Sequence, residues 1–341
     1  MDARTALIAI AGGDTLSRAD ARSAMASVMS GEATAAQLGA LLAAMHVRGE
    51  TVDEIAGFAT ALRDAAVHVD APGGAIDTCG TGGDRSNTFN ISTVAAIVAA
   101  AAGARVAKHG NRAASSACGS ADVLEALGVT IDLGPAGVAA CLGQVGLGFM
   151  FAPRFHPAMR HAAPVRRELG IRTVFNILGP LANPAGVRRQ LLGVPTPALG
   201  GTMAHVLRDL GADLALVVHG GGGLDEISPT GPTMTWEVRG GVVREGNLSP
   251  EDVGLAPVPL SELRGGDPAT NAGIARSVLG GAPGGARTAV LLNAGAALYV
   301  AGLVTSVKQG VATAAQALDR GSAAECLTRF VSTTGRLAVA A

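Results

Sequence analysis

From residue 75 onward, short runs of aliphatic residues alternate with glycine turns and alanine-rich stretches. This alternation of strand-like and helix-like segments is typical of an α/β sheet, in which helices connect parallel strands. The run 235–243 differs, because Gly240 and Gly241 divide it and indicate an antiparallel hairpin. We therefore expect a mixed, mostly parallel central sheet. Its strands are predicted at 75–79, 105–108, 129–133, 148–151, 190–194, 213–219 and 233–243.

The first 70 residues carry only helix signals. Ser17, Thr34 and Thr51 each precede a run with apolar residues at helical spacing, which is the position of an N-cap. Glu54 stands three residues after Thr51, so this pair also predicts a capping box. We expect three short helices, and the alanines on their faces would permit close contact between helices or subunits.

A chain of 341 residues is long enough for roughly two domains of about 150 residues each. The turn-forming cluster DAPGG at 70–74 is the expected boundary. We predict a small helical domain over 1–72 and a larger α/β domain over 73–341. Part of 153–185, with a helix at 157–169, is expected to join the helical domain.

Composition excludes several classes of protein. Lys and Arg total 26 and Asp and Glu total 27, and this net charge of −1 argues against a broad surface for nucleic acid or anionic membrane. The four cysteines share no CxxC spacing, so neither a zinc knuckle nor a disulfide framework is expected. The longest apolar run, 94–102, is too short to span a bilayer, and the first residues lack the pattern of a signal peptide. We expect a cytoplasmic protein that binds neither membrane nor nucleic acid.

The segment 79–93 (CGTGGDRSNTFNIST) lies between a predicted strand and a helix that begins near Ser92. Glycines ahead of a helix let several backbone N–H groups converge on one anion, and the helix dipole adds to the attraction. The segment matches neither the GxxxxGK[ST] nor the GxGxxG nucleotide-binding pattern. A plain glycine turn with a capped helix is the alternative, but Asp84 and the polar run after it favour a phosphate-binding loop.

A second polar segment, 108–122 (KHGNRAASSACGSAD), follows the predicted strand at 105–108. It gathers Lys108, His109, Asn111 and small or hydroxyl-bearing residues in a chain that is poor in charge. Small side chains would admit a ligand, hydroxyl and N–H groups would bind its oxygens, and a lysine would supply a positive charge. This composition favours a loop around a phosphorylated sugar. For His109 alone, an ordinary hydrogen-bonded loop histidine is the alternative.

Asp225 and Glu226 follow an apolar strand and four consecutive glycines. Ligands of α/β sheets gather at the carboxyl ends of strands, and adjacent carboxylates there suit Mg²⁺. Capping of the following segment by the two acids is an equally good interpretation.

Arg166 and Arg167 lie in the predicted helix at 157–169. Arginine binds a planar carboxylate with two parallel hydrogen bonds. Most such arginines are instead solvated or paired helix charges, and the residues alone do not single out either one.

With these motifs, the sequence resembles the anthranilate phosphoribosyltransferase family over nearly its whole length. Among the matching segments, those at 80–93 and 108–128 are highly specific in combination. Pyrimidine nucleoside phosphorylases share the family's fold, but they have a KxSxR-type loop where this chain has KHGNR and resemble it less. The segments that carry the resemblance are GEAT at 31–34, GTGGD…TFNIST at 80–93, KHGNRAASSACGSADVLEALG at 108–128, RTVFNILGPLANP at 172–184, VVHGGGGLDEIS at 217–228 and NAGAALYVAG at 293–302.

The resemblance implies transfer of the phosphoribosyl group of 5-phosphoribosyl 1-pyrophosphate to the amine of anthranilate. The products are N-(5-phosphoribosyl)anthranilate and pyrophosphate, in the second step of tryptophan biosynthesis from chorismate. It also implies a homodimer formed through the helical domain. Phosphoribosyl pyrophosphate is expected to contact Gly80, Gly83, Asp84, Thr88, Asn90, Ile91, Ser92, Thr93, Lys108, His109, Gly110, Asn111, Arg112, Ala113, Ala114, Ser115, Ser116 and Ser120.

The same resemblance places anthranilate on Gly80, Asn111 and Arg166, with His109 close by. Mg²⁺, with two ions per monomer expected, would be held by Ser92, Asp225 and Glu226. The chain departs from the family at Gly222, where an acid is usual. No general acid or base is expected, so catalysis would depend on positioning and electrostatics.

Two other functions remain possible from the sequence, namely a pyrimidine nucleoside phosphorylase and a non-catalytic relative that binds nucleic acid. The net charge and the intact Asn111 and Arg166 argue against the second.

Overall fold

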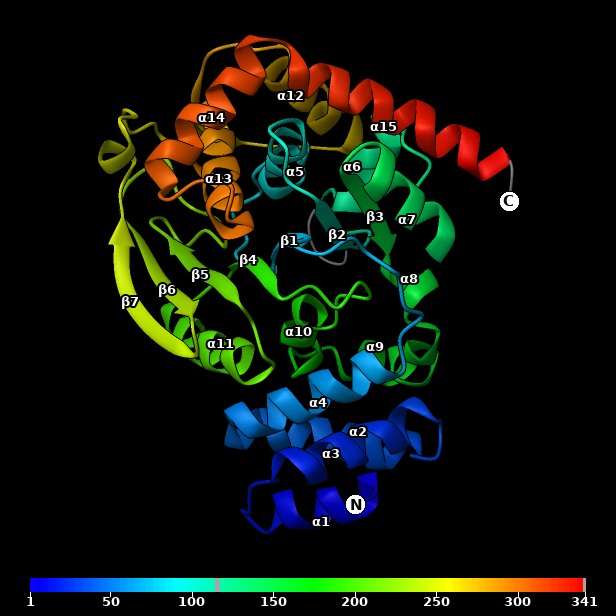
Figure 1. Ribbon diagram of the computed structural model, residues 1–341. Coiled ribbons are helices and arrows are strands. Elements are labelled where there is room, and N and C mark those ends of the chain that lie inside the picture. The colour runs from blue at the N-terminus through cyan, green and yellow to red at the C-terminus, as the bar shows by residue number, and fades with distance from the viewer. Residues whose placement is uncertain (114–116, 340–341) are drawn as a thin grey trace.

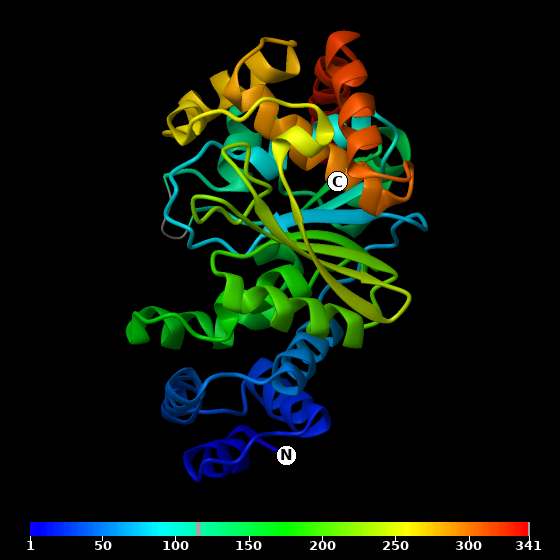
Figure 2. The same ribbon diagram turned by 90° about the vertical axis from the view of Figure 1, so that its left-hand side faces the viewer.

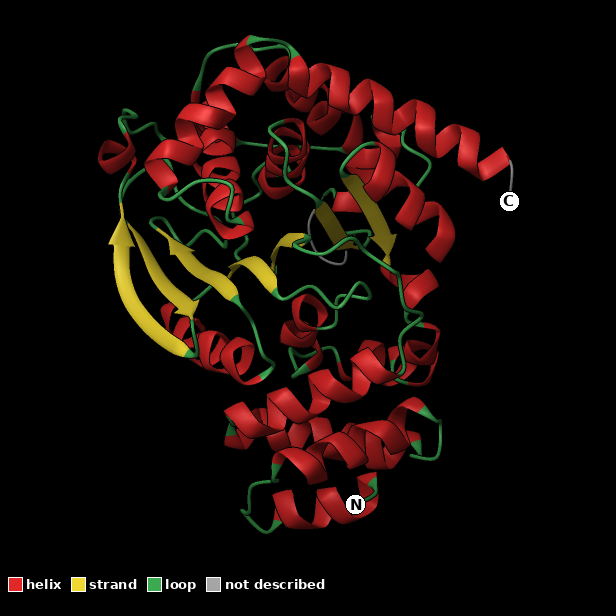
Figure 3. Ribbon diagram, in the orientation of Figure 1, coloured by secondary structure: helices red, strands yellow, loops and turns green. Residues whose placement is uncertain are grey.

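The computed structural model of the chain describes residues 1–113 and 117–339. A helical bundle lies at one end of the molecule and a sheet covered by helices forms the rest (Figures 1 and 3). A side view shows the bundle and helices α12–α15 at opposite ends, with the sheet between them (Figure 2). The expected fold class, a helical domain with an α/β domain, is confirmed.

The sheet has seven strands in the order β3-β2-β1-β4-β5-β6-β7. Strands β1 to β5 are parallel, whereas β6 and β7 form an antiparallel hairpin that turns at Gly240 and Gly241. The prediction of a mixed, mostly parallel sheet is therefore confirmed. The bounds are β1 Ile76–Gly80, β2 Val106–Gly110, β3 Leu147–Phe151, β4 Arg189–Gly193, β5 Leu214–Gly220, β6 Thr233–Arg239 and β7 Val242–Leu248.

The strand predicted at 129–133 is wrong. Val129, Ile131 and Leu133 are buried in alternation as in a strand, but the segment pairs with no described strand. The N–H of Thr130 instead donates to the hydroxyl of Thr334 in the C-terminal helix, at 3.2 Å. The alternation of burial thus comes from an extended segment that packs against a helix.

Four helices, not the three expected, form the bundle: α1 Ala3–Ala11, α2 Arg18–Met29, α3 Ala35–Arg48 and α4 Val52–Asp64. The predicted N-caps Ser17, Thr34 and Thr51 are confirmed, and Glu54 completes the capping box of α4. The additional helix is α1, whose N-cap Asp2 accepts a hydrogen bond from the N–H of Thr5. Its short apolar sequence lacks the alternation of apolar and polar residues by which the other three were identified.

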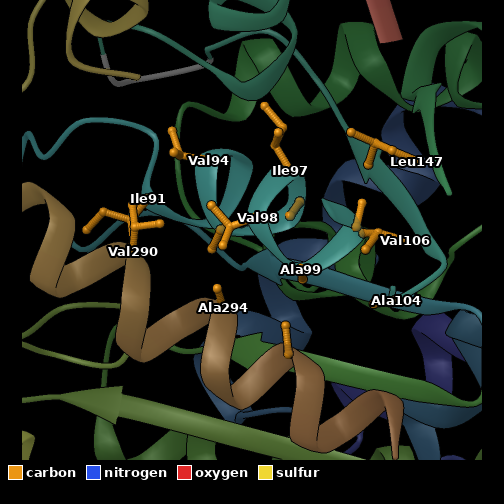
Figure 4. Close-up of a cluster of buried hydrophobic side chains, with 14 of the residues drawn as sticks. Ile91, Val94, Ile97, Val98, Ala99, Ala104, Val106, Leu147, Val290 and Ala294 are labelled. Carbon is orange, nitrogen blue, oxygen red and sulfur yellow. The ribbon is translucent and has the colours of Figure 1, made fainter. Parts of the chain in front are cut away.

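The upper face of the sheet in Figure 1 is covered by a layer of helices around a buried core of alanine and branched aliphatic residues. Figure 4 shows Ile91 and Val98 of α5 in this core, with Val290 and Ala294 of the neighbouring α13. The helices of this layer are α5 Ile91–Ala101, α6 Ser120–Ala126, α7 Pro135–Gln144, α12 Pro268–Leu279, α13 Gly285–Ala301, α14 Val307–Asp319 and α15 Ser322–Val339.

A second core runs from the bundle through residues 162–182 to the other face of the sheet, where it includes Leu192, Val217 and Trp236. The helix expected at 157–169 is divided into η1 Pro157–His161 and α9, since Pro164 lies in the first turn of α9. No helix of the described residues is long and apolar enough to cross a membrane. The remaining helices here are α8 Ala152–Phe155, α9 Ala163–Leu169, α10 Phe175–Leu178, η2 Gly179–Leu181 and α11 Pro197–Asp209, while η3 Pro250–Val253 and η4 Leu260–Leu263 follow β7.

Candidate active site

The central parallel strands β1, β2, β4 and β5 all end in glycine, at Gly80, Gly110, Gly193 and Gly220. The segment after β5 folds back across these ends, and a side chain at Gly80 would collide with the carboxylate of Asp225. At Gly193 a side chain would collide with the backbone of Asp225. The glycines therefore let the polar loops meet at one edge of the sheet.

The predicted phosphate loop connects β1 with α5 and takes an unusual backbone path. Gly82 and Gly83 have positive φ angles, and so do Arg85 and Asn87, at 57° and 52°. Asp84 stabilises this path by accepting a hydrogen bond from the N–H of Ser86, at 3.2 Å. The loop thus depends on its residues' tolerance of left-handed backbone.

The first N–H groups of α5 are bonded within the protein: that of Ile91 donates to the carbonyl of Phe89 at 2.7 Å, and that of Thr93 donates to the carbonyl of Asn90 at 3.1 Å. Asn90 is the N-cap residue but makes no side-chain cap, because its amide donates to the carbonyl of Cys118 and accepts from Asn271. The N–H of Ser92 donates to Glu226 Oε1 at 3.0 Å. Carboxylate oxygens therefore already occupy an anion-binding position at this helix end.

The acidic pair is half-buried in the same place. Asp225 Oδ2 accepts from the N–H of Gly82 at 2.7 Å. Burial and the nearby Asp84 raise the pKa of Asp225 to about 7. Burial and the charge of Asp225 raise the pKa of Glu226 to about 8, although Lys108 opposes this shift. Crowded, desolvated acids of this kind are stabilised by a cation.

The donor set suits Mg²⁺ bound together with a phosphate ligand. No group of three or more His, Cys, Asp or Glu side chains forms a metal cage within 1–113 and 117–339. Mg²⁺ is commonly bound by one or two carboxylates, with waters and substrate phosphates completing its coordination. Asp225, Glu226 and the Ser92 hydroxyl fit that pattern by their chemistry and position.

The second predicted loop follows β2. The guanidinium of Arg112 is paired with Asp122 and Glu125 rather than free. The hydroxyl of Ser120 donates to the carbonyl of Asn111, at 3.3 Å. Asp122 accepts from the N–H of Ala113 at 2.9 Å, which fixes the start of the loop. The expected contacts Ala114, Ser115 and Ser116 lie outside the described residues.

A cavity of about 570 Å³ opens between the ends of β1 and β2 and the segment 152–182. Three of the predicted anthranilate contacts, Gly80, Asn111 and Arg166, line it together with His109. Arg166 lies over the ring of Phe175, 5.0 Å from its centroid. The structure thus brings residues of three separate motifs to one cavity.

Two histidines share the floor of this cavity. The rings of His109 and His156 lie 4.9 Å apart, and burial lowers their pKa values to about 3 and about 4. Both are therefore neutral near pH 7. His109 Nε2 and Thr81 Oγ1 are buried without a hydrogen-bond partner among the described residues, so a ligand could bind them.

The sequence did not reveal His156, Arg172 and Asp77. His156 lacks a polar motif, and Arg172 lies beside Gly83 only because that glycine has no side chain. Asp77 is an isolated acid inside a predicted strand. Its charge within a strand that is buried on both faces could have marked it as a residue with a special role. At Gly222, the departure from the family pattern, φ is +84°, which favours glycine.

Comparisons with known proteins agree with this geometry. Two family models match, "Glycosyl transferase family, a/b domain" over residues 73–324 and "Glycosyl transferase family, helical bundle domain" over 4–66. Anthranilate phosphoribosyltransferase of Chloroflexus aurantiacus is 54% identical over 334 residues, covering 97% of this chain and 98% of that protein.

Solved structures of the same enzyme are similar throughout. That from Thermus thermophilus has a TM-score of 0.92 and 47% identity, over 98% of this chain and 99% of that one. That from Saccharomyces cerevisiae, in complex with phosphoribosyl pyrophosphate and Mg, has a TM-score of 0.89 and 29% identity, over 97% of each chain.

Proposed function

Since the chain belongs to the anthranilate phosphoribosyltransferase family, we propose that it transfers the phosphoribosyl group of 5-phosphoribosyl 1-pyrophosphate to the amine of anthranilate. The products are N-(5-phosphoribosyl)anthranilate and pyrophosphate, in tryptophan biosynthesis. The observation that carries the proposal is the arrangement of the cavity, in which Arg166 lies on one wall and the phosphate loop begins at the other.

The phosphorylated substrate would bind along the carboxyl ends of β1 and β2. Backbone N–H groups of the loop at Gly80–Asp84 would donate to the diphosphate, and the dipole of α5 would add to the attraction. The ribose and its 5-phosphate would contact the end of β2 and the loop after it, from Lys108 to Ser116. Ser92, Asp225 and Glu226 would hold Mg²⁺, for which we propose two ions per monomer, and the ion would neutralise the charge that develops on pyrophosphate.

Anthranilate would lie in the cavity with its carboxylate on Arg166 and its amine toward the ribose. The guanidinium is half-buried, and burial lowers its pKa without removing its charge, so it can pair with a carboxylate. Asn111 supplies an amide at the same cavity. The neutral rings of His109 and His156 would contribute flat, weakly polar walls for an aromatic ligand.

The reaction forms a bond between the amine nitrogen and the anomeric carbon as the bond from that carbon to pyrophosphate breaks. An aromatic amine is uncharged near pH 7, so it attacks without prior loss of a proton and releases its extra proton afterwards. His109, with a pKa of about 3, stays neutral. The protein's contribution is then alignment of the reactants and hydrogen bonding to the leaving group.

The loss of anthranilate fluorescence on addition of phosphoribosyl pyrophosphate and Mg²⁺ tests this function directly. The proposal expects loss that requires both additions and that releases pyrophosphate in equal amount. Phosphorolysis of thymidine without any use of anthranilate would instead identify a nucleoside phosphorylase. A shift of single-stranded DNA in a gel at moderate salt would favour the nucleic-acid-binding alternative.

Assembly as a homodimer through the helical bundle is part of the proposal. Light scattering behind size-exclusion chromatography would measure it. A mass near 33.7 kDa, that of one chain, would contradict it.

A further inference from the structure

Strands β1 and β2 are neighbours in the sheet, but their backbone pairing ends after one register pair. They share the single register pair Ile76 and Val106, whereas β1 pairs with β4 and β2 with β3 at five positions each. The N–H of Ile76 donates to the carbonyl of Arg105, as expected in a parallel ladder. Beyond this pair the two strands separate toward the edge of the sheet that carries the candidate active site.

Side chains replace the next rung of the ladder completely. A regular parallel ladder would join the N–H of Thr78 to the carbonyl of Ala107, and the N–H of His109 to the carbonyl of Thr78. Here Asp77 Oδ1 accepts from both N–H groups, at 2.8 Å and 3.3 Å. The carbonyl of Ala107 accepts from Asn183 Nδ2 at 2.9 Å, and that of Thr78 accepts from Lys108 Nζ.

The three side chains are removed from water, and two of them, Asp77 and Asn183, are bonded to each other. Asn183 Nδ2 also donates to Asp77 Oδ2, at 2.7 Å. Asp77 is 0% exposed, and Lys108 and Asn183 are each 3% exposed. Burial of a charge costs free energy, and the nearby positive charge of Lys108 offsets part of that cost for the Asp77 carboxylate. For folding alone, regular backbone hydrogen bonds between β1 and β2, with apolar side chains at positions 77 and 108, would have been sufficient.

We propose that Asp77 is a positioning residue for the reaction, and that with Lys108 and Asn183 it holds β1 and β2 apart where the substrates meet. Asp77 acts through the residues on either side of the gap. Its carboxylate fixes the backbone of His109, which lines the cavity, and provides the countercharge to Lys108, which lies close to Glu226. The proposal rests on the function proposed above.

The test compares Asp77→Asn with Glu54→Gln. In Asp77→Asn, an NH₂ group replaces one of the two carboxylate oxygens. It would face the amide donor of Asn183 or the N–H groups of Thr78 and His109, so at least one of these donors would lose its acceptor. The substitution would also leave Lys108 without a countercharge. Glu54 is the matched control, since it is also 0% exposed and pairs with an arginine, Arg48, but lies in the bundle. Thermal midpoints, kcat and KM for both substrates are measured, the kinetics at a temperature well below every midpoint.

We expect both variants to melt earlier, whereas only Asp77→Asn should lose kcat/KM for both substrates, on the order of 100-fold, as misplacement of reacting groups produces. Wild-type kinetics in Asp77→Asn, with a lowered midpoint, would overturn the proposal. If that variant does not fold, Asn183→Ala decides by the same criterion, because it removes the two hydrogen bonds to Asp77 and Ala107, and one from the N–H of Ala185, and keeps both charges. Failure of the wild-type protein to transfer the phosphoribosyl group would refute the proposed function instead.

Discussion

Replacement of Arg166 by alanine tests the proposed orientation of anthranilate. The side chain is half-buried on the wall of the cavity and lies over Phe175, so it is held in place before a ligand arrives. A hydrogen bond to a charged group contributes about 1.5–3 kcal/mol, and about 1.4 kcal/mol corresponds to a factor of ten. Loss of the guanidinium should therefore raise the KM for anthranilate on the order of 10- to 150-fold.

The KM for phosphoribosyl pyrophosphate should change little, because that substrate would bind at separate loops. Initial rates of anthranilate fluorescence loss, measured while each substrate is varied in turn, give both constants. Arg167→Ala is the matched control, since Arg167 is the exposed neighbour on the same helix and does not line the cavity. Arg166→Lys should recover only part of the affinity, because an ammonium cannot form two parallel bonds to a carboxylate. Equal rises in both KM values, or equal effects of the two alanine variants, would refute the assignment.

Three further changes test the phosphate side of the site. Asp225→Asn should shift the Mg²⁺ titration of activity to higher concentration, and an unchanged titration would remove Asp225 from the metal site. Gly80→Ala should lose most activity, since its methyl group would collide with the Asp225 carboxylate, and near-normal rates would contradict the close approach. The pKa values of Asp225 and Glu226, about 7 and about 8, mean that these acids retain protons in the folded protein that the unfolded chain has lost. The thermal midpoint without Mg²⁺ should therefore fall as pH rises from 6.5 to 8, and Mg²⁺ should offset the fall; calorimetry showing a rise would refute the argument.

Local signals made parts of the fold predictable. Ser17, Thr34 and Thr51 each cap a helix through atoms three residues away, so the sequence contains the whole interaction. The segment 129–133 was misread because its alternating pattern records only which side chains are buried. Whether an extended segment joins a sheet depends on its backbone partner, and here the partner is the hydroxyl of Thr334, 204 residues away from Thr130.

The residues of the candidate site likewise divide into those recognisable from local sequence and those whose role depends on distant partners. Gly80 and Asn111 belong to conspicuous glycine-rich and polar motifs, whereas only the family resemblance distinguished Arg166 from Arg167. The structure brings all three to one cavity. Asp77 and Asn183 could not be recognised in this way. Each is an ordinary polar residue, and their roles depend on bonds between residues 106 apart.

Lys108 shows how the replaced rung determines a residue type. The chain contains only two lysines, Lys108 and Lys308, among 26 basic residues, so arginine is its usual cation. In the gap between β1 and β2, one carbonyl, that of Thr78, accepts from the cation, and the countercharge is Asp77. A compact ammonium on a flexible stem fits these partners, whereas a guanidinium would bring five N–H donors into a buried space and leave most of them unsatisfied. The same ammonium opposes the rise in the pKa of Glu226, so these side chains connect the cavity that we propose for anthranilate with the proposed metal site.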